Sequence, residues 1–230
     1  MKHTIHTLPI LLAASALAQT APAPAPAKSA WTQTHNLALA TDYIFRGVTQ
    51  IGGDGIAFSG GTDVSHTSGF SAGIWAANQT WTPDVGSGLE VDVYAGYTAS
   101  LGDLAVSLGV ISYHYQGYNA ANTTEASLGL AAHGLSVKYS SSLTDYFDFV
   151  DSSGVGYLDV SYSVTASDLT LGLHYGATFG EGSQESYNDY KVSLSYPLGG
   201  YTATLAYTDT DGFDSIEESD ELVFSLSRTF

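Results

Sequence analysis

The 230-residue sequence contains no cysteine. A chain without cysteine has no disulfide scaffold, no thiolate zinc site and no cysteine that could carry a lipid anchor. Basic residues are also scarce: 6 Lys and Arg stand against 23 Asp and Glu, which gives a formal net charge of −17. Because so acidic a chain cannot neutralise a run of phosphates, we expect no nucleic-acid partner.

Long apolar runs are missing too. From His35 onward there is no run of 18 apolar residues and no sustained 3.6-residue periodicity, so the sequence predicts no transmembrane helix. Charged residues make up only 13% of the chain, against about 25% in an average globular protein. The 28 aromatic residues and 25 glycines exclude a solvated disordered chain. We therefore do not expect an ordinary charged, water-facing exterior.

The first 18 residues are typical of a secretory signal peptide. Lys2 precedes an apolar stretch from Leu8 to Ala18, and small residues at Ala16 and Ala18 predict cleavage before Gln19. The loss of Lys2 leaves five basic against 23 acidic residues, a formal charge of −18. Residues 19–34, which include QTAPAPAPAK, are predicted to form an extended Ala/Pro-rich spacer. We expect an exported protein whose folded domain spans residues 35–230.

This domain alternates apolar and polar residues with a period of two, the pattern of β-strands. Leu89, Val91 and Val93 share one parity, for example, and Glu90 and Asp92 share the other. Twelve such segments are predicted, near residues 37–46, 56–65, 70–78, 89–98, 104–115, 124–131, 135–141, 158–164, 169–178, 187–196, 201–208 and 220–230.

The connections between these segments alternate in length. Long loops are predicted near residues 49–55, 79–88, 116–123, 142–155, 179–186 and 209–219, with turns of three or four residues between them. A soluble β-sandwich has no reason to segregate its loops in this way, and it would leave edge strands unpaired. We predict an all-β fold, an antiparallel transmembrane β-barrel of about 12 strands, with long extracellular loops and short periplasmic turns.

Tyrosine placement agrees with a barrel. Many of the 16 tyrosines lie near predicted strand ends: Tyr43, Tyr97, Tyr139, Tyr175, Tyr187, Tyr196, Tyr201 and Tyr207. At a membrane interface the ring lies in apolar surroundings while the hydroxyl stays wet, so these residues are predicted to form girdles. The alternative explanation is that tyrosine is merely a good strand former.

Several sequence blocks resemble one known family. TDYIFRGVTQ (residues 41–50), SGFSAGIWAANQ (68–79), EVDVYAGY (90–97) and LVFSLSRTF (222–230) occur in the order of that family's blocks. Over residues 34–230 the chain is similar to the TorF family of porins from proteobacterial outer membranes. The resemblance implies an outer-membrane barrel acting as a passive porin-like channel. The terminal Phe230 resembles the signal by which outer-membrane barrels are recognised for insertion, which implies the barrel-assembly machinery as a partner.

If the apolar parity faces lipid, the polar parity faces the lumen. A charge on the lipid face near the midplane costs about 2–4 kcal/mol for Arg or Lys, so inward placement is expected. The predicted lumen and selectivity residues are Asp42, Arg46, Glu90, Asp92, Glu125, Lys138, Asp159, Asp189, Lys191 and Glu221, with Asp63 also inward and Trp75 lining or blocking the path. Their acidic excess favours small neutral or cationic polar solutes over anions.

Other interpretations stay open. Lys138, expected between Glu125 and Asp159, could belong to cross-strand pairs that hold a packed, non-conducting interior. The barrel would then have a structural or adhesive role, with its outer loops binding partners or lipopolysaccharide. A barrel hydrolase would need a Ser, a His and an acid together, and His114, His133 and His174 have serines nearby but none in a nucleophile-like turn. We predict no catalytic residue, no metal and no cofactor.

Overall fold

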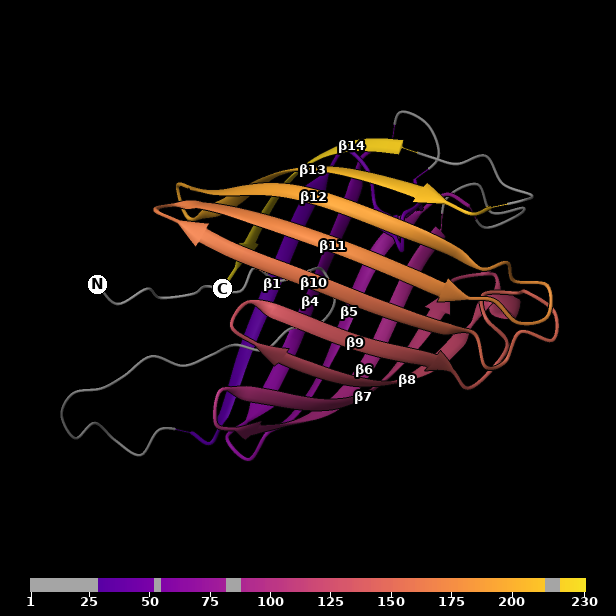
Figure 1. Ribbon diagram of the computed structural model, residues 1–230, viewed down its shortest axis with the longest axis horizontal. Helices are drawn as coiled ribbons and strands as arrows, with labels where there is room; N and C mark the ends of the chain where they lie inside the picture. The colour runs from indigo at the N-terminus through magenta and orange to yellow at the C-terminus, as the bar shows by residue number, and fades with distance from the viewer. Residues whose placement is uncertain (1–28, 52–54, 82–87, 214–219) are drawn as a thin grey trace.

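The computed structural model describes residues 29–51, 55–81, 88–213 and 220–230. In these residues, twelve strands form one closed antiparallel barrel (Figure 1). The barrel strands are β1 Trp31–Ala40, β4 Ala57–His66, β5 Phe70–Gln79, β6 Gly88–Leu101, β7 Leu104–Tyr115, β8 Thr123–Ala132, β9 Leu135–Ser142, β10 Gly156–Ala166, β11 Leu169–Phe179, β12 Tyr187–Leu198, β13 Tyr201–Asp211 and β14 Asp220–Thr229. β1 closes the cylinder by pairing with β4 on one side and β14 on the other. The predicted fold class is confirmed.

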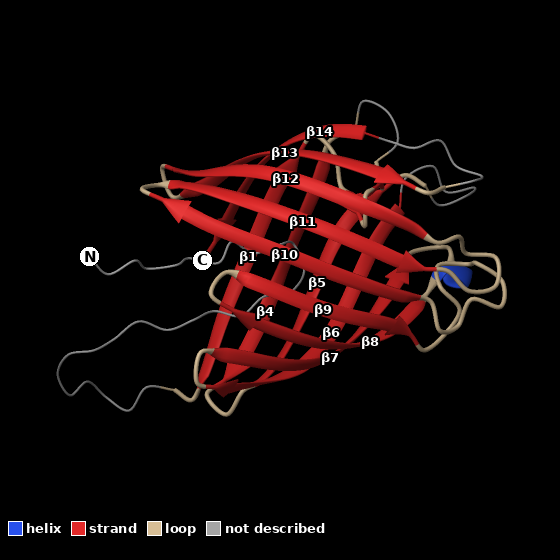
Figure 2. Cartoon of the chain, in the orientation of Figure 1, coloured by secondary structure: helices blue, strands red, loops and turns tan. Residues whose placement is uncertain are grey.

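The two ends of the barrel differ (Figure 2). β1 begins and β14 finishes at the end that carries the tight turns, which we call the short-turn end. The turn between β8 and β9 is typical, because His133 and Gly134 both have positive φ, 51° and 85°, as a type I′ hairpin turn requires. The opposite, long-loop end carries the extended connections, including the short 3-10 helix η1 Asn119–Ala121. None of the described residues forms a helix long and apolar enough to cross a membrane.

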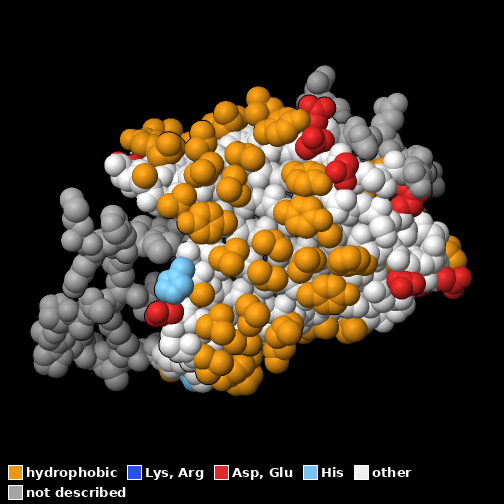
Figure 3. All heavy atoms as spheres, in the orientation of Figure 1, with side chains coloured by type: hydrophobic (Ala, Val, Ile, Leu, Met, Phe, Trp, Pro, Cys, Tyr) orange, Lys and Arg blue, Asp and Glu red, His pale blue; other side chains and the backbone are white. Residues whose placement is uncertain are grey.

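The wall has an apolar outside. Side chains of the apolar parity point away from the barrel, and Leu37 and Leu128 are 58% and 51% exposed. Large apolar side chains cover the visible middle of the cylinder, whereas acidic side chains gather toward the long-loop end (Figure 3). So broad an apolar belt is unfavourable in water and is the surface that a transmembrane β-barrel presents to hydrocarbon.

Aromatic side chains border this belt at the long-loop end. The outward hydroxyls of Tyr175 and Tyr190 donate hydrogen bonds to Asn188 and Asp211, at 2.9 Å each. Such a tyrosine keeps its ring among apolar neighbours and its hydroxyl bound to a polar group. Two of the predicted girdle residues were assigned wrongly: Tyr187 is buried inside the barrel on the parity of Asp189, and Tyr43 also lies inside.

The predicted first strand, residues 37–46, is also wrong in its bounds. β1 starts at Trp31, within the segment predicted as a spacer, and stops at Ala40. The chain then turns into the barrel and forms a small hairpin from β2 Ile44–Phe45 and β3 Val48–Thr49, hereafter the inner hairpin. Alternation of residue type could not reveal this change, because a hairpin inside the lumen alternates as a wall strand does. The predicted signal peptide, residues 1–18, lies outside the described residues.

Candidate functional site: the barrel lumen

The inner hairpin is set by its turn. Its two central residues, Arg46 and Gly47, both have positive φ, 47° and 79°, which favours Gly at the second position. A Cβ on Gly47 would lie 2.4 Å from Thr210 Cγ2 and 2.6 Å from Asp189 Cβ. The hairpin tip therefore packs directly against the inner faces of β12 and β13.

Arg46 anchors this tip. Its Nη2 donates to Glu125 Oε2 at 2.7 Å and its Nη1 to the Tyr146 hydroxyl at 3.0 Å. The guanidinium also lies over the rings of Tyr157, Phe45 and Tyr146, at 4.2, 4.9 and 5.5 Å from their centroids. Glu125 is only 2% exposed, so removal of Arg46 would leave a buried, uncompensated carboxylate, a loss of about 3–5 kcal/mol.

Aromatic rings fill the space around this ion pair. Phe45 from the inner hairpin packs edge-on against Tyr113 and Phe147, with centroids 5.8 and 5.5 Å apart. Phe147 belongs to the loop between β9 and β10, so hairpin and loop meet inside the barrel. In the same loop, burial raises the pKa of Tyr146 to about 12. Tyr146 therefore remains a neutral hydrogen-bonding group beside Arg46 at any ordinary pH.

The inner face of β6 carries two predicted lumen residues. Glu90 and Asp92 are both buried, and the Tyr43 hydroxyl donates to Glu90 Oε1 at 3.0 Å. Trp75 from β5 points inward and packs against the Tyr43 ring at 5.5 Å. Trp75 thus lies against the segment that leads into the inner hairpin and helps to fill the interior.

His174 forms the centre of a second network, on β10 to β12. Its Nε2 lies 2.8 Å from Asp189 Oδ1, and its Nδ1 lies 2.9 Å from Ser161 Oγ. Ser161 donates its own proton to Asp159 Oδ1 at 2.8 Å, and the Tyr157 hydroxyl donates to Asp189 Oδ2 at 3.0 Å. Both ring nitrogens of His174 are therefore hydrogen-bonded inside the lumen.

This geometry bears on the hydrolase interpretation. Ser161 Oγ lies 2.8 Å from Asp159 Oδ1 and 2.9 Å from His174 Nδ1, but Ser161 is a residue of the β10 wall and not of a nucleophile-like turn. His114 lies on the exposed outer parity of β7, and His133 lies in a turn near Asp103 at 3.8 Å. The three histidines therefore do not converge, and the cluster around His174 is an ion-pair network.

The remaining predicted lumen residues point inward, as the alternation predicts, but two of them, Lys138 and Asp42, differ from the prediction in their neighbours or position. Lys191 on β12 pairs in register with His174, and Glu221 on β14 pairs with buried Thr208. Lys138 pairs with Asp159 as expected, but its neighbour on β8 is Gly129 and not Glu125. Lys138 thus lies on the strand between those of Glu125 and Asp159, as expected, but the expected cross-strand pair with Glu125 is wrong, because Glu125 lies opposite Ser142 and binds Arg46.

Asp42 is the second residue that differs from the prediction. It belongs to the connection between β1 and β2 and not to the wall. Its carboxylate accepts hydrogen bonds from Thr49 Oγ1 at 2.7 Å and from the Tyr43 amide at 2.6 Å. Asp42 therefore closes the base of the inner hairpin.

The other half of the lumen is lined differently. Toward the short-turn end the inward positions hold Ser, Thr, Gly and Ala, for example Ser107, Ser127, Ser136, Ser163, Thr204, Ser225 and Ser227, and these seven stay partly exposed. The largest inward group at this level is Tyr94, whose hydroxyl donates to Asp63 Oδ1 at 2.6 Å. Within the described part of the chain, no group of three His, Asp or Glu has metal-binding geometry.

These features define a transmembrane β-barrel with a polar interior that is packed at its long-loop half. A family model described as "Bacterial protein of unknown function (Gcw_chp)" matches residues 24–230, and the chain belongs to this family. No protein with a curated function matches the sequence.

Solved structures share the fold, among them the following two. A structure of the KdgM porin has a TM-score of 0.60 at 13% identity, and the match covers 86% of this chain and 99% of that one. A chain from work on the mechanism behind the in-meso crystallization of membrane proteins has a TM-score of 0.55 at 11% identity, with 86% and 83% covered. At these identities the similarity concerns the fold alone.

Proposed function

We propose that the protein is an outer-membrane, porin-like channel of the TorF type for the passive diffusion of small polar solutes. Its apolar belt supports a membrane location, and a bacterial barrel with strands of this kind belongs in the outer membrane. The cleaved signal peptide, residues 1–18, belongs to the same proposal because export precedes insertion. The shared fold with the KdgM porin is consistent with this assignment.

The polar interior is the observation that carries the proposal. Among the described residues, seven carboxylates and three Lys or Arg side chains point into the cylinder: Asp63, Glu90, Asp92, Glu125, Asp159, Asp189 and Glu221, with Arg46, Lys138 and Lys191. A charged interior is costly unless its charges are paired, hydrogen-bonded or solvated by water or solute. The short-turn half, with its small hydroxyl side chains, can hold water. The net negative charge favours neutral or cationic solutes.

Passage through the long-loop half requires displacement of the inner hairpin. This half is dense, yet it is incompletely satisfied, since Asp92 Oδ1 and Glu125 Oε1 are buried with no hydrogen-bond partner among the described residues. Each such atom costs about 1–3 kcal/mol. A closed state that retains these costs is easier to open than a fully hydrogen-bonded one, and the inner hairpin is the part of the channel that would move.

Planar-bilayer recording tests the proposal. We expect purified wild-type protein to give small, cation-biased conductance steps, and a variant with residues 42–50 replaced by a short Gly-Ser linker to give larger ones. The same linker in place of residues 181–185, in another loop, is the control and should leave the steps unchanged. Silence of both wild type and the hairpin-less variant would refute the channel.

A non-conducting barrel is the second candidate, and the packing of Arg46 and its aromatic neighbours favours it. In that case the long loops would supply the function by binding partners or lipopolysaccharide. Insertion through the barrel-assembly machinery, with Phe230 as the recognised end, is proposed for either candidate. The exposed Phe230 backbone pairs with His35, at 2.9 and 3.2 Å, so the last strand is held in the closed wall.

A further inference from the structure

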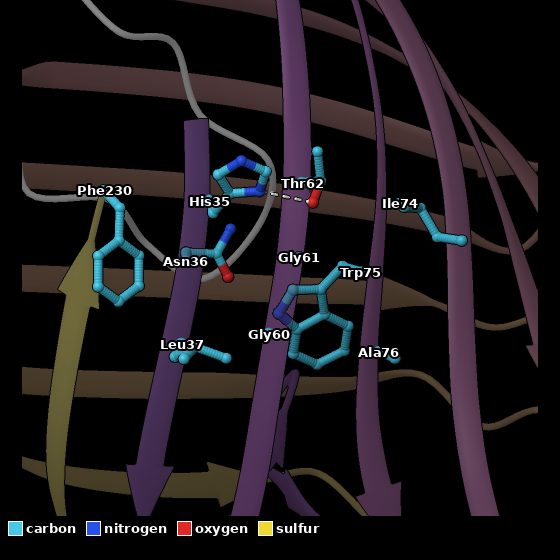
Figure 4. A pocket seen from close by; sticks show the side chains of 10 residues that line it. All are labelled: His35, Asn36, Leu37, Gly60, Gly61, Thr62, Ile74, Trp75, Ala76 and Phe230. Atoms are coloured by element: carbon cyan, nitrogen blue, oxygen red, sulfur yellow. Dashed lines mark hydrogen bonds between the residues drawn. The ribbon is translucent and has the colours of Figure 1, made fainter. Parts of the chain in front are cut away.

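The outer wall is hollowed at one place, beside the junction of β1, β4 and β5. Two adjoining pockets, of about 440 and 570 Å³, share Leu37, Gly60, Ala76 and Phe230 as lining residues. Figure 4 shows the first of them, with Leu37 and Phe230 on one side and Ile74 on the other. Both are open depressions of the outer wall and not enclosed cavities.

The hollow exists because two outward positions are small. Gly60 and Ala76 are paired in register and form its floor, and the larger Leu37, Phe58 and Ile74 rise around them. A Cβ at Gly60 would lie 2.7 Å from Leu37 Cδ2 and 3.0 Å from the Asn36 carbonyl oxygen. A side chain at Gly60 would therefore have to displace Leu37 and press on the Asn36 carbonyl, which favours glycine at this position of the floor.

A cation lies at one edge of the hollow. Arg228 lines the second pocket, and within the described residues it is the one Lys or Arg on the outer face. Its guanidinium lies over the rings of Phe230 and Tyr201, at 4.8 and 5.4 Å from their centroids. Tyr201 follows the tight turn at Gly199–Gly200, so this charge lies at the short-turn rim.

The cation lies on the same register row as the floor. Arg228 pairs with Leu37, Leu37 pairs with Gly60, and Gly60 pairs with Ala76. Arg228 and Gly60 are therefore two strand spacings apart, roughly 10 Å. The hollow thus runs across the wall from a charged edge on β14 to an apolar floor on β4 and β5.

We infer that this hollow binds one glycerophospholipid of the inner leaflet, with an acyl chain over Gly60 and Ala76 and its phosphate on Arg228. A guanidinium bonds phosphate oxygens through paired N–H groups, which gives the head group a fixed position. The inference rests on the outer-membrane placement proposed above but not on conduction, so recordings that refute the channel would leave it standing.

Native mass spectrometry of the full chain in detergent, titrated with phosphatidylglycerol, tests the inference. We expect one retained lipid on the wild type, and a loss of affinity of about tenfold in Arg228→Gln, where a charge-assisted bond is removed. Ala76→Leu, which fills the floor, should lose retention as well. Ala95→Leu is the matched control, because Ala95 is outward on β6 and outside both pockets.

Equal retention by all four proteins would overturn the inference, and so would a homodimer that forms through this face and carries no lipid. A shift in gel mobility between unboiled and boiled samples in SDS shows that each variant is folded, because a closed barrel resists SDS until it is boiled. Arg228→Gln keeps the test valid if Ala76→Leu does not fold, because Arg228 is exposed and removal of its charge leaves the wall intact.

Discussion

The long-loop half and the short-turn half of the lumen are built from the same twelve strands, but their contents are opposite. The long-loop half holds buried Glu90, Asp92 and Glu125 together with a hairpin that carries Arg46. The short-turn half is lined by Ser, Thr, Gly and Ala, and many of these positions, such as Ser107 and Ser136, remain partly exposed, although Thr170 and Ser195 are buried. The strands therefore fix the cylinder, whereas the loops that fold into it decide how much of the cylinder is filled.

The two halves of the lumen also differ in their charged side chains. The long-loop half concentrates charges that bind one another, such as Arg46 with Glu125 and His174 with Asp189. Such pairs are stable only as complete sets, because a single buried charge without its partner is strongly unfavourable. The short-turn half relies on hydroxyl groups that water can solvate. The same kind of substitution should therefore have different consequences in the two halves.

The largest effect is expected for Arg46→Met, which leaves Glu125 buried without its cation. We expect the free energy of unfolding to fall by about 3–5 kcal/mol, measured by urea titration of the protein refolded in detergent. The double variant Arg46→Met with Glu125→Leu should recover much of that loss, because no uncompensated charge remains. A double variant as unstable as the single one would contradict the assigned ion pair.

The second prediction compares an arginine on the outer face of the wall with an arginine on its inner face. Leu128→Arg places a cation on the lipid face and should cost about 2–4 kcal/mol if this residue lies near the midplane. Ser127→Arg, its neighbour in the short-turn half of the lumen, should cost little and should instead reduce cation preference. Equal losses of folding free energy from the two variants would show that the assigned faces are wrong.

A third, smaller effect concerns the hairpin tip. Gly47→Ala introduces strain at positive φ and a close contact with Asp189 and Thr210, and should cost about 1–3 kcal/mol. Gly102→Ala is the control, since Gly102 has φ 65° in a tight turn but nothing within 4 Å of an added Cβ. We expect larger conductance steps for the Gly47 variant alone. Identical behaviour of both variants would argue against packing of the hairpin on β12 and β13.

The smallest effect is expected for Asp63→Asn in the short-turn half. Loss of one lumen carboxylate should move the reversal potential modestly toward lower cation selectivity, without changing stability, because Tyr94 can still donate to the amide oxygen. The measurement is a reversal potential under a salt gradient. A reversal potential that does not move would place Asp63 outside the conducting path.

The wall was predictable from sequence because alternation with period two is a local property. The positions of the strands after the first, the inward placement of Asp159 and Asp189, and the tight turns all follow from neighbouring residues. His174 could have been assigned to the lumen by the same rule, since Leu173 and Tyr175 on either side are outward.

The filling of the long-loop half was not predictable in this way. The inner hairpin keeps the alternation of a strand, so Tyr43 and Phe45 look like lipid-facing residues although they lie inside. The one signal in the sequence was Gly47 after Arg46, because glycine is favoured where a two-residue hairpin turn requires positive φ, as Arg46 and Gly47 have in the structure. Tyr146 and Phe147 lie in a loop without periodicity, and only the tertiary contact with Arg46 and Phe45 reveals their place.

Thiol labelling tests most directly whether the wall has a lipid face, a wet lumen half and a filled lumen half. The chain has no cysteine, so Ser127→Cys, Leu128→Cys and Thr210→Cys can each be labelled alone in lipid vesicles with a charged, membrane-impermeant reagent. We predict fast labelling at position 127, none at 128, and slow labelling at 210, where the threonine is only 2% exposed against the tip of the inner hairpin. Labelling at position 128 as fast as at 127 would contradict the account.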